Sequence, residues 1–174
     1  MSIKISLKKN LNIKSVKNHV FFTNQDFKIS ELSKLPIFKF SNFIAESVRK
    51  SNLIKKNIFS FNINASQKII LEKIKNNKSS LEIEKLGAEF YVYLKSNLYF
   101  KTTFYEQNIK NVGLKNEYFF DQFIQGLQLK SYEFNKYKSK NIEKNFDIEI
   151  INKNKSFRFN KNKKFRSLIE GTNL

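Results

Sequence analysis

Hydrophobic and polar residues alternate over several short stretches of the chain, which is the pattern of strands with one buried face. Residues 3–8 read Ile-Lys-Ile-Ser-Leu-Lys, and residues 146–151 read Phe-Asp-Ile-Glu-Ile-Ile. Residues 19–23 form a short apolar run, and residues 99–105 are rich in aromatic and β-branched side chains. Each of these stretches is therefore predicted to be a strand.

Two more predicted strands lie close together along the chain. Residues 58–63 and 68–74 are both rich in isoleucine and phenylalanine or leucine, and Asn64, Ala65 and Ser66 follow the first of them. A connection this short is typical of a β-hairpin. The two strands are therefore expected to pair in antiparallel fashion.

Three- and four-residue spacing of apolar side chains predicts helices between the strands. Ser41 or Asn42 can cap the first helix, and Phe40, Ile44 and Val48 then share one face. The helix is expected to end near residues 51–52.

The second helix carries the most specific local signal. Ser79 and Glu82 have the spacing of a capping box, in which each side chain satisfies a free N–H group of the other residue. Gly87 lies inside this helix, where glycine costs about 1 kcal/mol relative to alanine. That cost indicates close packing at Gly87, which we expect to be against a strand.

The third helix is expected to run from Glu117 to about Tyr137 and to be the longest of the set. One stripe along it carries Phe120, Phe123, Ile124, Leu127, Ser131 and Phe134. Residues 152–163 read as a Lys/Asn linker, and a further helix is expected from residue 165. The order of strands and helices predicts an α/β fold, with a mixed, mostly parallel sheet of about six strands and helices on both faces.

Composition supports a folded domain but leaves its partners open. The chain has 174 residues, of which 40% are hydrophobic, and a net charge of +18. Its lysines are spread along the whole sequence, which favours compositional drift over a dedicated phosphate-binding surface, although weak non-specific polyanion binding follows from either interpretation. There is no cysteine, no apolar leader at the start and no stretch of the roughly 18 apolar residues that a membrane helix needs. We therefore expect a cytoplasmic protein without a membrane partner.

Residues able to perform chemistry are few and scattered. His19 is the only histidine, so it is expected to be structural rather than a metal ligand. Asp26, Asp121 and Asp147 fall on different predicted elements, whereas a two-metal hydrolase needs several carboxylates that converge. The four glycines are far apart, which argues against a phosphate-binding loop.

The aromatic strand offers one alternative use. Tyr99, Phe100, Phe104 and Tyr105, together with Lys101, could form a stacking platform for single-stranded nucleic acid. Because alternate positions on a strand face opposite sides, half of this set is expected to lie in the core.

Residues 126–138 read Gly-Leu-Gln-Leu-Lys-Ser-Tyr-Glu-Phe-Asn-Lys-Tyr-Lys. This stretch resembles the pattern G-x-x-L-x-S-Y-x-F-x-x-Y-K near the close of the N-terminal domain of leucyl (cytosol) aminopeptidases. The matching positions are Gly126, Leu129, Ser131, Tyr132, Phe134, Tyr137 and Lys138. A second family pattern, E-G-x-N-L, is similar to the stretch that contains Glu170, Gly171, Asn173 and Leu174.

The resemblance implies a division of the chain and a role for it. Residues 1–151 would form the aminopeptidase-like N-terminal α/β domain, a macro-domain-like three-layer sandwich, and residues 152–174 would form a linker and the start of a helix leading to a catalytic domain. The family consists of exopeptidases that remove N-terminal residues with two divalent metals, zinc or manganese, usually as homo-hexamers. Its reactive residues lie in the C-terminal domain, so no catalytic, metal-binding or cofactor-binding residue is expected on this chain.

The sequence also departs from the family. Relatives usually carry glycines in the turn after the fourth strand, where this chain has residues 72–77, Glu-Lys-Ile-Lys-Asn-Asn. A Gly-Lys turn before the third strand is replaced by Lys55, Lys56 and Asn57. The signature residues themselves allow close helix packing and carry no hydrolytic chemistry, so they are interpreted as structural.

Two other functions remain open at this point. A basic nucleic-acid-binding module would explain the net charge of +18. A small-ligand module of the macro-domain type, binding ADP-ribose, would fit the same fold, but the missing glycine loops count against it.

Overall fold

The computed structural model describes residues 3–10, 12–29, 37–51, 56–75, 79–105, 107–108, 118–131 and 145–151. Strands and helices alternate along the chain in the expected order. The elements are β1 (Ile3–Lys8), η1 (Ile13–Ser15), β2 (Asn18–Thr23), η3 (Phe38–Phe40), α1 (Ser41–Lys50), β3 (Ile58–Asn62), β4 (Lys68–Lys73), α2 (Ser80–Ser96), β5 (Lys101–Tyr105), α4 (Phe119–Ser131) and β6 (Phe146–Ile151).

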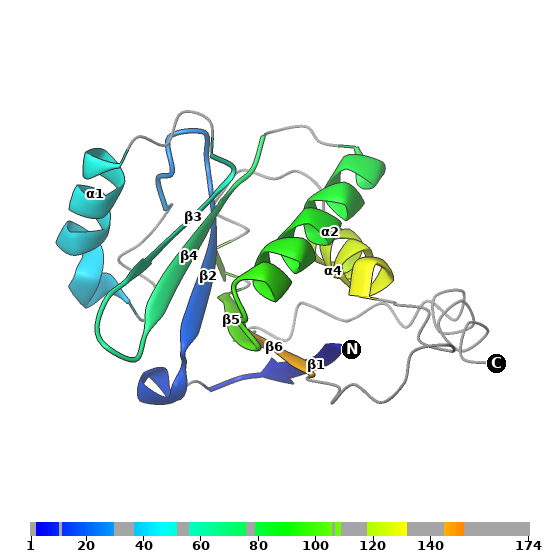
Figure 1. Ribbon diagram of the computed structural model, residues 1–174, viewed down its shortest axis with the longest axis horizontal. Coiled ribbons are helices and arrows are strands. Elements are labelled where there is room, and N and C mark those ends of the chain that lie inside the picture. Colours follow the sequence, from blue (N-terminus) through cyan, green and yellow to red (C-terminus); the bar gives the residue numbers. More distant parts are fainter. Residues whose placement is uncertain are drawn as a thin grey trace.

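A single six-stranded sheet organises the described residues, with the strand order β1-β6-β5-β2-β4-β3. Every neighbouring pair is parallel except β3 and β4, which are antiparallel. The prediction of a mixed, mostly parallel sheet of about six strands is therefore confirmed. Helix α1 covers one face, whereas α2 and α4 lie side by side on the other (Figure 1).

Two apolar clusters fill the space between these layers. The larger lies between the sheet and the α2–α4 pair and includes Val20, Phe22, Phe104 and Ile148 from the central strands. The smaller lies on the α1 face, where Ile44 of the helix packs with residues of β2 and β4. Because alternate residues of a strand point to opposite faces, β2 contributes to both clusters and is buried along its whole length. The helix–sheet–helix arrangement gives the expected three layers.

The hairpin and the capping box are both confirmed. Ile58 pairs with Glu72 and Asn62 pairs with Lys68 in antiparallel register. The side chain of Ser79 accepts a hydrogen bond from the Glu82 backbone N–H, and the Glu82 carboxylate accepts one from the Ser79 backbone N–H, at the start of α2. Both local signals depend on neighbours in sequence, which explains why they could be recognised without the fold.

Two local predictions are wrong. Helix α1 begins at Ser41, but neither Ser41 nor Asn42 caps it; the N-cap is Phe40, which makes no side-chain capping bond, because the 3-10 turn η3 runs directly into the helix. Gly87 packs against another helix, α4, and not against a strand.

Several expectations fall outside the described residues. These are the course of the third helix beyond residue 131, the linker at residues 152–163 and the helix expected from residue 165. Within the part of the chain that the structure describes, no helix combines the length and apolar character needed to cross a membrane.

Candidate functional site

The carboxyl ends of β2 and β5 mark the point in the sheet where a ligand is most often bound in an open α/β fold. These strands are neighbours, yet the chain that leaves β2 leads to α1 on one face and the chain that leaves β5 leads to α4 on the other (Figure 1). Connections that diverge in this way open a crevice at the strand ends. This crevice is therefore the first place to look for a functional site.

In this protein the side chain of Asn108 bridges the crevice. The Phe22 backbone N–H donates to Asn108 Oδ1 at 2.6 Å, and Asn108 Nδ2 donates to the Phe22 carbonyl oxygen at 3.0 Å. Asn108 is fully buried, although it lies three residues beyond the end of β5. The amide thus continues the hydrogen-bonding pattern of the sheet past Val20 and Phe104, where the backbone pairing of β2 and β5 stops.

Aromatic rings pack against Phe22, the β2 residue that Asn108 bonds. Phe22 packs edge-to-face against Phe119 and Phe123 of α4, with ring centroids 5.1 Å apart in each case. Its ring also lies 5.8 Å from that of Phe104 on β5. The Phe22 side chain is therefore enclosed by aromatic rings on the α2–α4 face of the sheet.

Two carboxylates lie near the same end of the molecule but do not form a metal centre. Glu72 of β4 is fully buried on the α2–α4 side of the sheet. Asp121, in the first turn of α4, is partly buried, and this desolvation raises the pKa of its carboxyl above the ordinary value. No group of three or more His, Asp or Glu side chains among the described residues is placed to hold a metal ion.

A second polar cluster lies on the α1 face of the sheet. His19 Nδ1 and the Tyr105 hydroxyl are joined by a hydrogen bond of 2.6 Å, and the two rings stack with Phe21. Burial lowers the pKa of His19 to about 4. Burial, together with the nearby charge of Glu149, raises the pKa of Tyr105 above its ordinary value. Both groups are therefore neutral near pH 7, and each provides the other with a hydrogen-bond partner inside the core.

Glu149 extends this cluster toward the edge of the sheet. Lys8 Nζ donates to Glu149 Oε1 at 2.5 Å, and Lys101 Nζ lies 3.5 Å from the same oxygen. Burial alone would raise the pKa of Glu149, but the Lys8 hydrogen bond and the Lys101 charge outweigh it and lower the pKa below the ordinary value. The side chain of Glu149 is only 9% exposed, so the pair links β1 to β6 rather than presenting a free carboxylate.

The structure places three of the signature residues. Gly126 is buried in α4 and lies against the backbone of α2, where Glu84 is its closest contact. Ser131, the last residue of α4, is buried, whereas Leu129 is 49% exposed. The signature positions outside the described residues are Tyr132, Phe134, Tyr137, Lys138, Glu170, Gly171, Asn173 and Leu174.

The aromatic stacking platform is not available on β5. Phe104 faces the α2–α4 layer and Tyr105 faces the α1 layer, and both are buried. Stacking with bases requires exposed rings, so Phe104 and Tyr105 cannot take part, whereas Tyr99 and Phe100 are only partly buried. Half of the set thus lies in the core, as expected.

Sequence reasoning missed Asn108 altogether. A polar residue just past the carboxyl end of a parallel strand was the one available signal. The Lys8–Glu149 pair could not have been found, because the two residues lie 141 positions apart and no pattern predicts that β1 and β6 are neighbours.

Comparisons with known proteins were made on both sequence and structure. The sequence matches no family model and no curated protein. Among solved structures, a mutant of tomato leucine aminopeptidase is similar with a TM-score of 0.58 and 16% identity, covering 88% of this chain and 33% of that chain. This chain therefore spans about a third of the aminopeptidase's length.

Two macrodomains match over nearly their whole length. The macrodomain of Mycobacterium tuberculosis DarG has a TM-score of 0.56 and 10% identity, covering 86% of this chain and 98% of that chain. The macrodomain of Thermus aquaticus DarG has a TM-score of 0.54 and 8% identity, covering 87% and 99%. This chain has a macrodomain-like α/β fold. Identities this low establish the fold alone.

Proposed function

We propose that this macrodomain-like chain is the non-catalytic N-terminal domain of a leucyl aminopeptidase-type metallo-exopeptidase, an enzyme that releases N-terminal amino acids from peptides. Its role is to pack against a catalytic domain of the parent polypeptide and to shape the assembly. Two independent observations support this: the Gly126–Lys138 pattern in the sequence, and the similarity to tomato leucine aminopeptidase over 88% of this chain.

The Asn108 bridge between the ends of β2 and β5 is the observation that carries the proposal. A macrodomain-like fold that binds a ligand at its strand ends needs open space there and backbone N–H groups free to face it. Here Asn108 occupies the Phe22 N–H and carbonyl groups, and the aromatic side chains of α4 pack beneath. This arrangement favours a packing role over a ligand-binding one.

The proposal also covers the metals and the oligomeric state of the parent enzyme. The two divalent cations, zinc or manganese, would be held by the catalytic domain, and the parent enzyme would assemble as a homo-hexamer. Hydrolysis would therefore require residues beyond those described in this chain.

The full reading frame that contains residues 1–174 provides the test. We expect it to encode a carboxylate-rich second domain, and the purified polypeptide to hydrolyse Leu-p-nitroanilide with Zn²⁺ or Mn²⁺. The isolated chain should show no turnover with either cation. Hydrolysis by pure 1–174 protein, or a reading frame without a second domain, would contradict the proposal.

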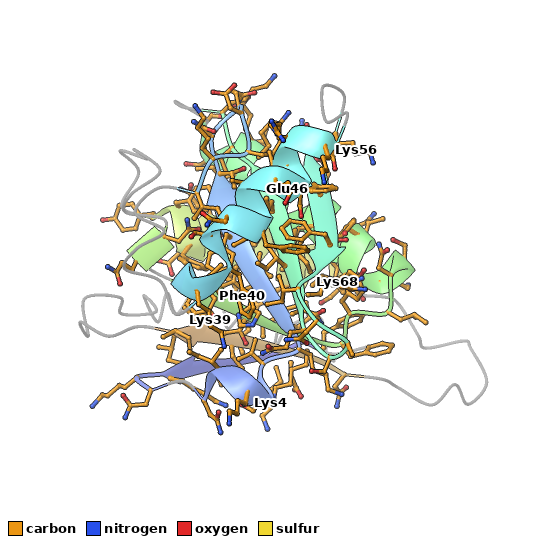
Figure 2. All side chains as sticks on the ribbon, turned by 90° about the vertical axis from the view of Figure 1, so that its left-hand side faces the viewer. Lys4, Lys39, Phe40, Glu46, Lys56 and Lys68 are labelled. Atoms are coloured by element: carbon orange, nitrogen blue, oxygen red, sulfur yellow. The ribbon has the colours of Figure 1, made fainter. Side chains whose placement is uncertain are left out.

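A second candidate function is binding of nucleic acid through a basic surface. The first 25 residues contain five lysines and no acidic residue, and Lys4, Lys9, Lys14 and Lys17 are exposed along the edge strand β1 and the turn η1. Figure 2 shows Lys4 at the rim of the sheet away from α1. Lysines on an edge strand also prevent edge-to-edge aggregation. The charge alone therefore does not distinguish a nucleic-acid-binding surface from a protected sheet edge.

Salt dependence separates these two explanations. A phosphate-binding surface predicts an affinity for a DNA or RNA duplex that falls steeply between about 50 and 200 mM salt. The variant with Lys4, Lys9, Lys14 and Lys17 replaced by glutamine should then lose most of this affinity, while replacing Lys50 and Lys130 on the helices should not. Undetectable binding near 50 mM salt would remove this candidate.

A further inference from the structure

Four polar side chains from different parts of the chain converge beside the β-hairpin, away from both clusters described above. They are Ser60 of β3, Lys68 of β4, Tyr93 of α2, and Tyr99 in the connection from α2 to β5. All four are partly exposed, in contrast to the buried His19–Tyr105 pair. Figure 2 labels Lys68 on the hairpin.

Their hydroxyl and ammonium groups are in contact. Lys68 Nζ donates a hydrogen bond of 2.5 Å to the Tyr99 hydroxyl oxygen, and it lies 4.6 Å from the centre of the same ring. The Tyr93 hydroxyl donates to Ser60 Oγ at 2.8 Å, and the Tyr93 and Tyr99 rings meet edge to face with centroids 5.9 Å apart. The Tyr99 oxygen is thus the acceptor of a lysine ammonium, with two further hydroxyls beside it.

The backbone holds Tyr99 in this position at some cost. Leu98 has a φ of 57°, the left-handed conformation in which glycine is favoured, although its side chain is 66% exposed. The Tyr99 N–H bonds to the Leu94 carbonyl at 3.0 Å, which closes the end of α2 before the chain enters β5. A left-handed residue just after the C-cap is a common way to end a helix, and here leucine stands where glycine is usual.

The groups around Tyr99 and Tyr93 change the pKa of each tyrosine. Partial burial alone would raise the pKa of Tyr99, but the hydrogen bonds from Lys68, Ser60 and Tyr93 and the Lys68 charge outweigh it and lower the pKa below its ordinary value. Tyr93, by contrast, has its pKa raised, chiefly by burial. The cluster therefore shifts the pKa values of two neighbouring tyrosines in opposite directions, down for Tyr99 and up for Tyr93.

We propose that Tyr99 is an activated phenol, and that Ser60, Lys68 and Tyr93 form a site at which its oxygen accepts a sulfonyl or phosphoryl group. The Tyr99 oxygen forms the new bond to sulfur or phosphorus, the leaving group departs with its bonding electrons, and the phenolic proton passes to solvent. Lys68 acts as a positioning residue that stabilises the phenolate. This inference does not depend on the proposed aminopeptidase relationship.

Covalent labelling of the full chain tests the proposal. The protein is treated with benzenesulfonyl fluoride between pH 6.5 and 9, and the labelled tyrosines are identified and timed by peptide mass spectrometry. Tyr118, which is 55% exposed at the start of α4, is the internal reference. We expect Tyr99 to be labelled severalfold faster than Tyr118 at pH 7.5, because the Lys68 ammonium that bonds the Tyr99 oxygen stabilises its phenolate.

Three variants then test whether Lys68 causes the fast labelling of Tyr99. Lys68→Met should bring the Tyr99 rate down to that of Tyr118, and Tyr99→Phe should remove the fast label. Lys14→Met, which removes an equal charge from the turn η1, should leave the Tyr99 rate unchanged. Equal labelling of Tyr99 and Tyr118 in the unaltered protein, which needs no variant to fold, would overturn the proposal, as would an unchanged Tyr99 rate in folded Lys68→Met.

Discussion

Gly87 and Gly126 form a reciprocal pair at the crossing of α2 and α4. A Cβ atom built on Gly87 would lie 1.9 Å from the Phe123 carbonyl oxygen of α4, and one built on Gly126 would lie 1.8 Å from the Glu84 carbonyl oxygen of α2. Each helix thus places a glycine against the backbone of the other. The close approach lets both helices reach the sheet and bury a continuous apolar layer.

Substitution of either glycine should therefore destabilise the fold. In Gly126→Ala the added methyl meets backbone atoms that cannot rotate away, and we expect a loss of about 1–3 kcal/mol in the free energy of unfolding, the usual range for overpacking. Urea denaturation followed by circular dichroism measures this loss. Lys130→Ala, exposed on the same helix, is the control and should change stability by less than about 0.5 kcal/mol. A Gly126→Ala protein as stable as this control would show that the helices can separate without cost.

Asn108 should matter for stability as much as a core residue does. Asn108→Ala leaves the Phe22 N–H and carbonyl buried without their partners, and each unsatisfied group costs about 1–3 kcal/mol. Asn10→Ala, an exposed asparagine after β1, is the matched control. We expect the Asn108 variant to unfold at a clearly lower urea concentration than the control, and coincident unfolding curves would mean that the bridge contributes little.

His19 should make stability depend on pH. Its pKa is about 4 in the folded protein and 6.5 as a free side chain, so the unfolded state binds the proton more tightly. The stabilisation is complete above pH 6.5 and is lost as the pH falls from 6.5 toward 4, by up to about 3 kcal/mol. Glu149, whose pKa is lowered, adds a further loss below its unfolded pKa of 4.5.

The His19 contribution can be isolated by comparing two proteins between pH 7 and 5, above the range where Glu149 titrates. The free energy of unfolding of the unaltered chain should fall over this interval, whereas that of His19→Gln should fall less steeply. Parallel slopes would show that His19 is not the titrating group.

Leu98 offers a substitution that should improve the protein. Glycine adopts a left-handed backbone without the penalty that leucine has, so Leu98→Gly should gain about 0.5–1 kcal/mol after the extra entropy of the unfolded chain is counted. Leu81→Gly, at a similarly exposed position inside α2, should instead lose about 1 kcal/mol. Equal losses in the two variants, measured by urea denaturation, would rule out relief of backbone strain at Leu98.

How much the sequence predicted depended on the distance over which each feature acts. The Ser79–Glu82 capping box and the β3–β4 hairpin involve near neighbours, and both could be read directly. Gly87 was recognised as a close-packing position, but its partner was assigned to a strand because spacing along one helix does not identify what lies opposite. The cap of α1 was misassigned because a preceding 3-10 turn changes which residue begins the helix.

The candidate site was less accessible to sequence reasoning than the fold. Asn108 and Phe22 are separated by 86 positions, and their contact depends on β2 and β5 being neighbours. The four-residue cluster around Tyr99 also requires the hairpin to lie against the end of α2. Residue type alone pointed to the aromatic side chains of β5, Phe104 and Tyr105, which the structure buries. It did not indicate the hydrogen bonds of Asn108 or of the cluster around Tyr99.

The most direct test of the packing role proposed for the Asn108 bridge is a calorimetric titration of the full chain with ADP-ribose, the ligand that a binding role for this fold would suggest. Because Asn108 already bonds the Phe22 backbone groups at the end of β2, and α4 rings pack against the Phe22 ring, we predict no heat of binding at ligand concentrations up to about 1 mM. That concentration corresponds to a binding free energy of about 4 kcal/mol. Saturable binding with micromolar affinity would contradict a purely structural role and would identify the chain as a ligand-binding module.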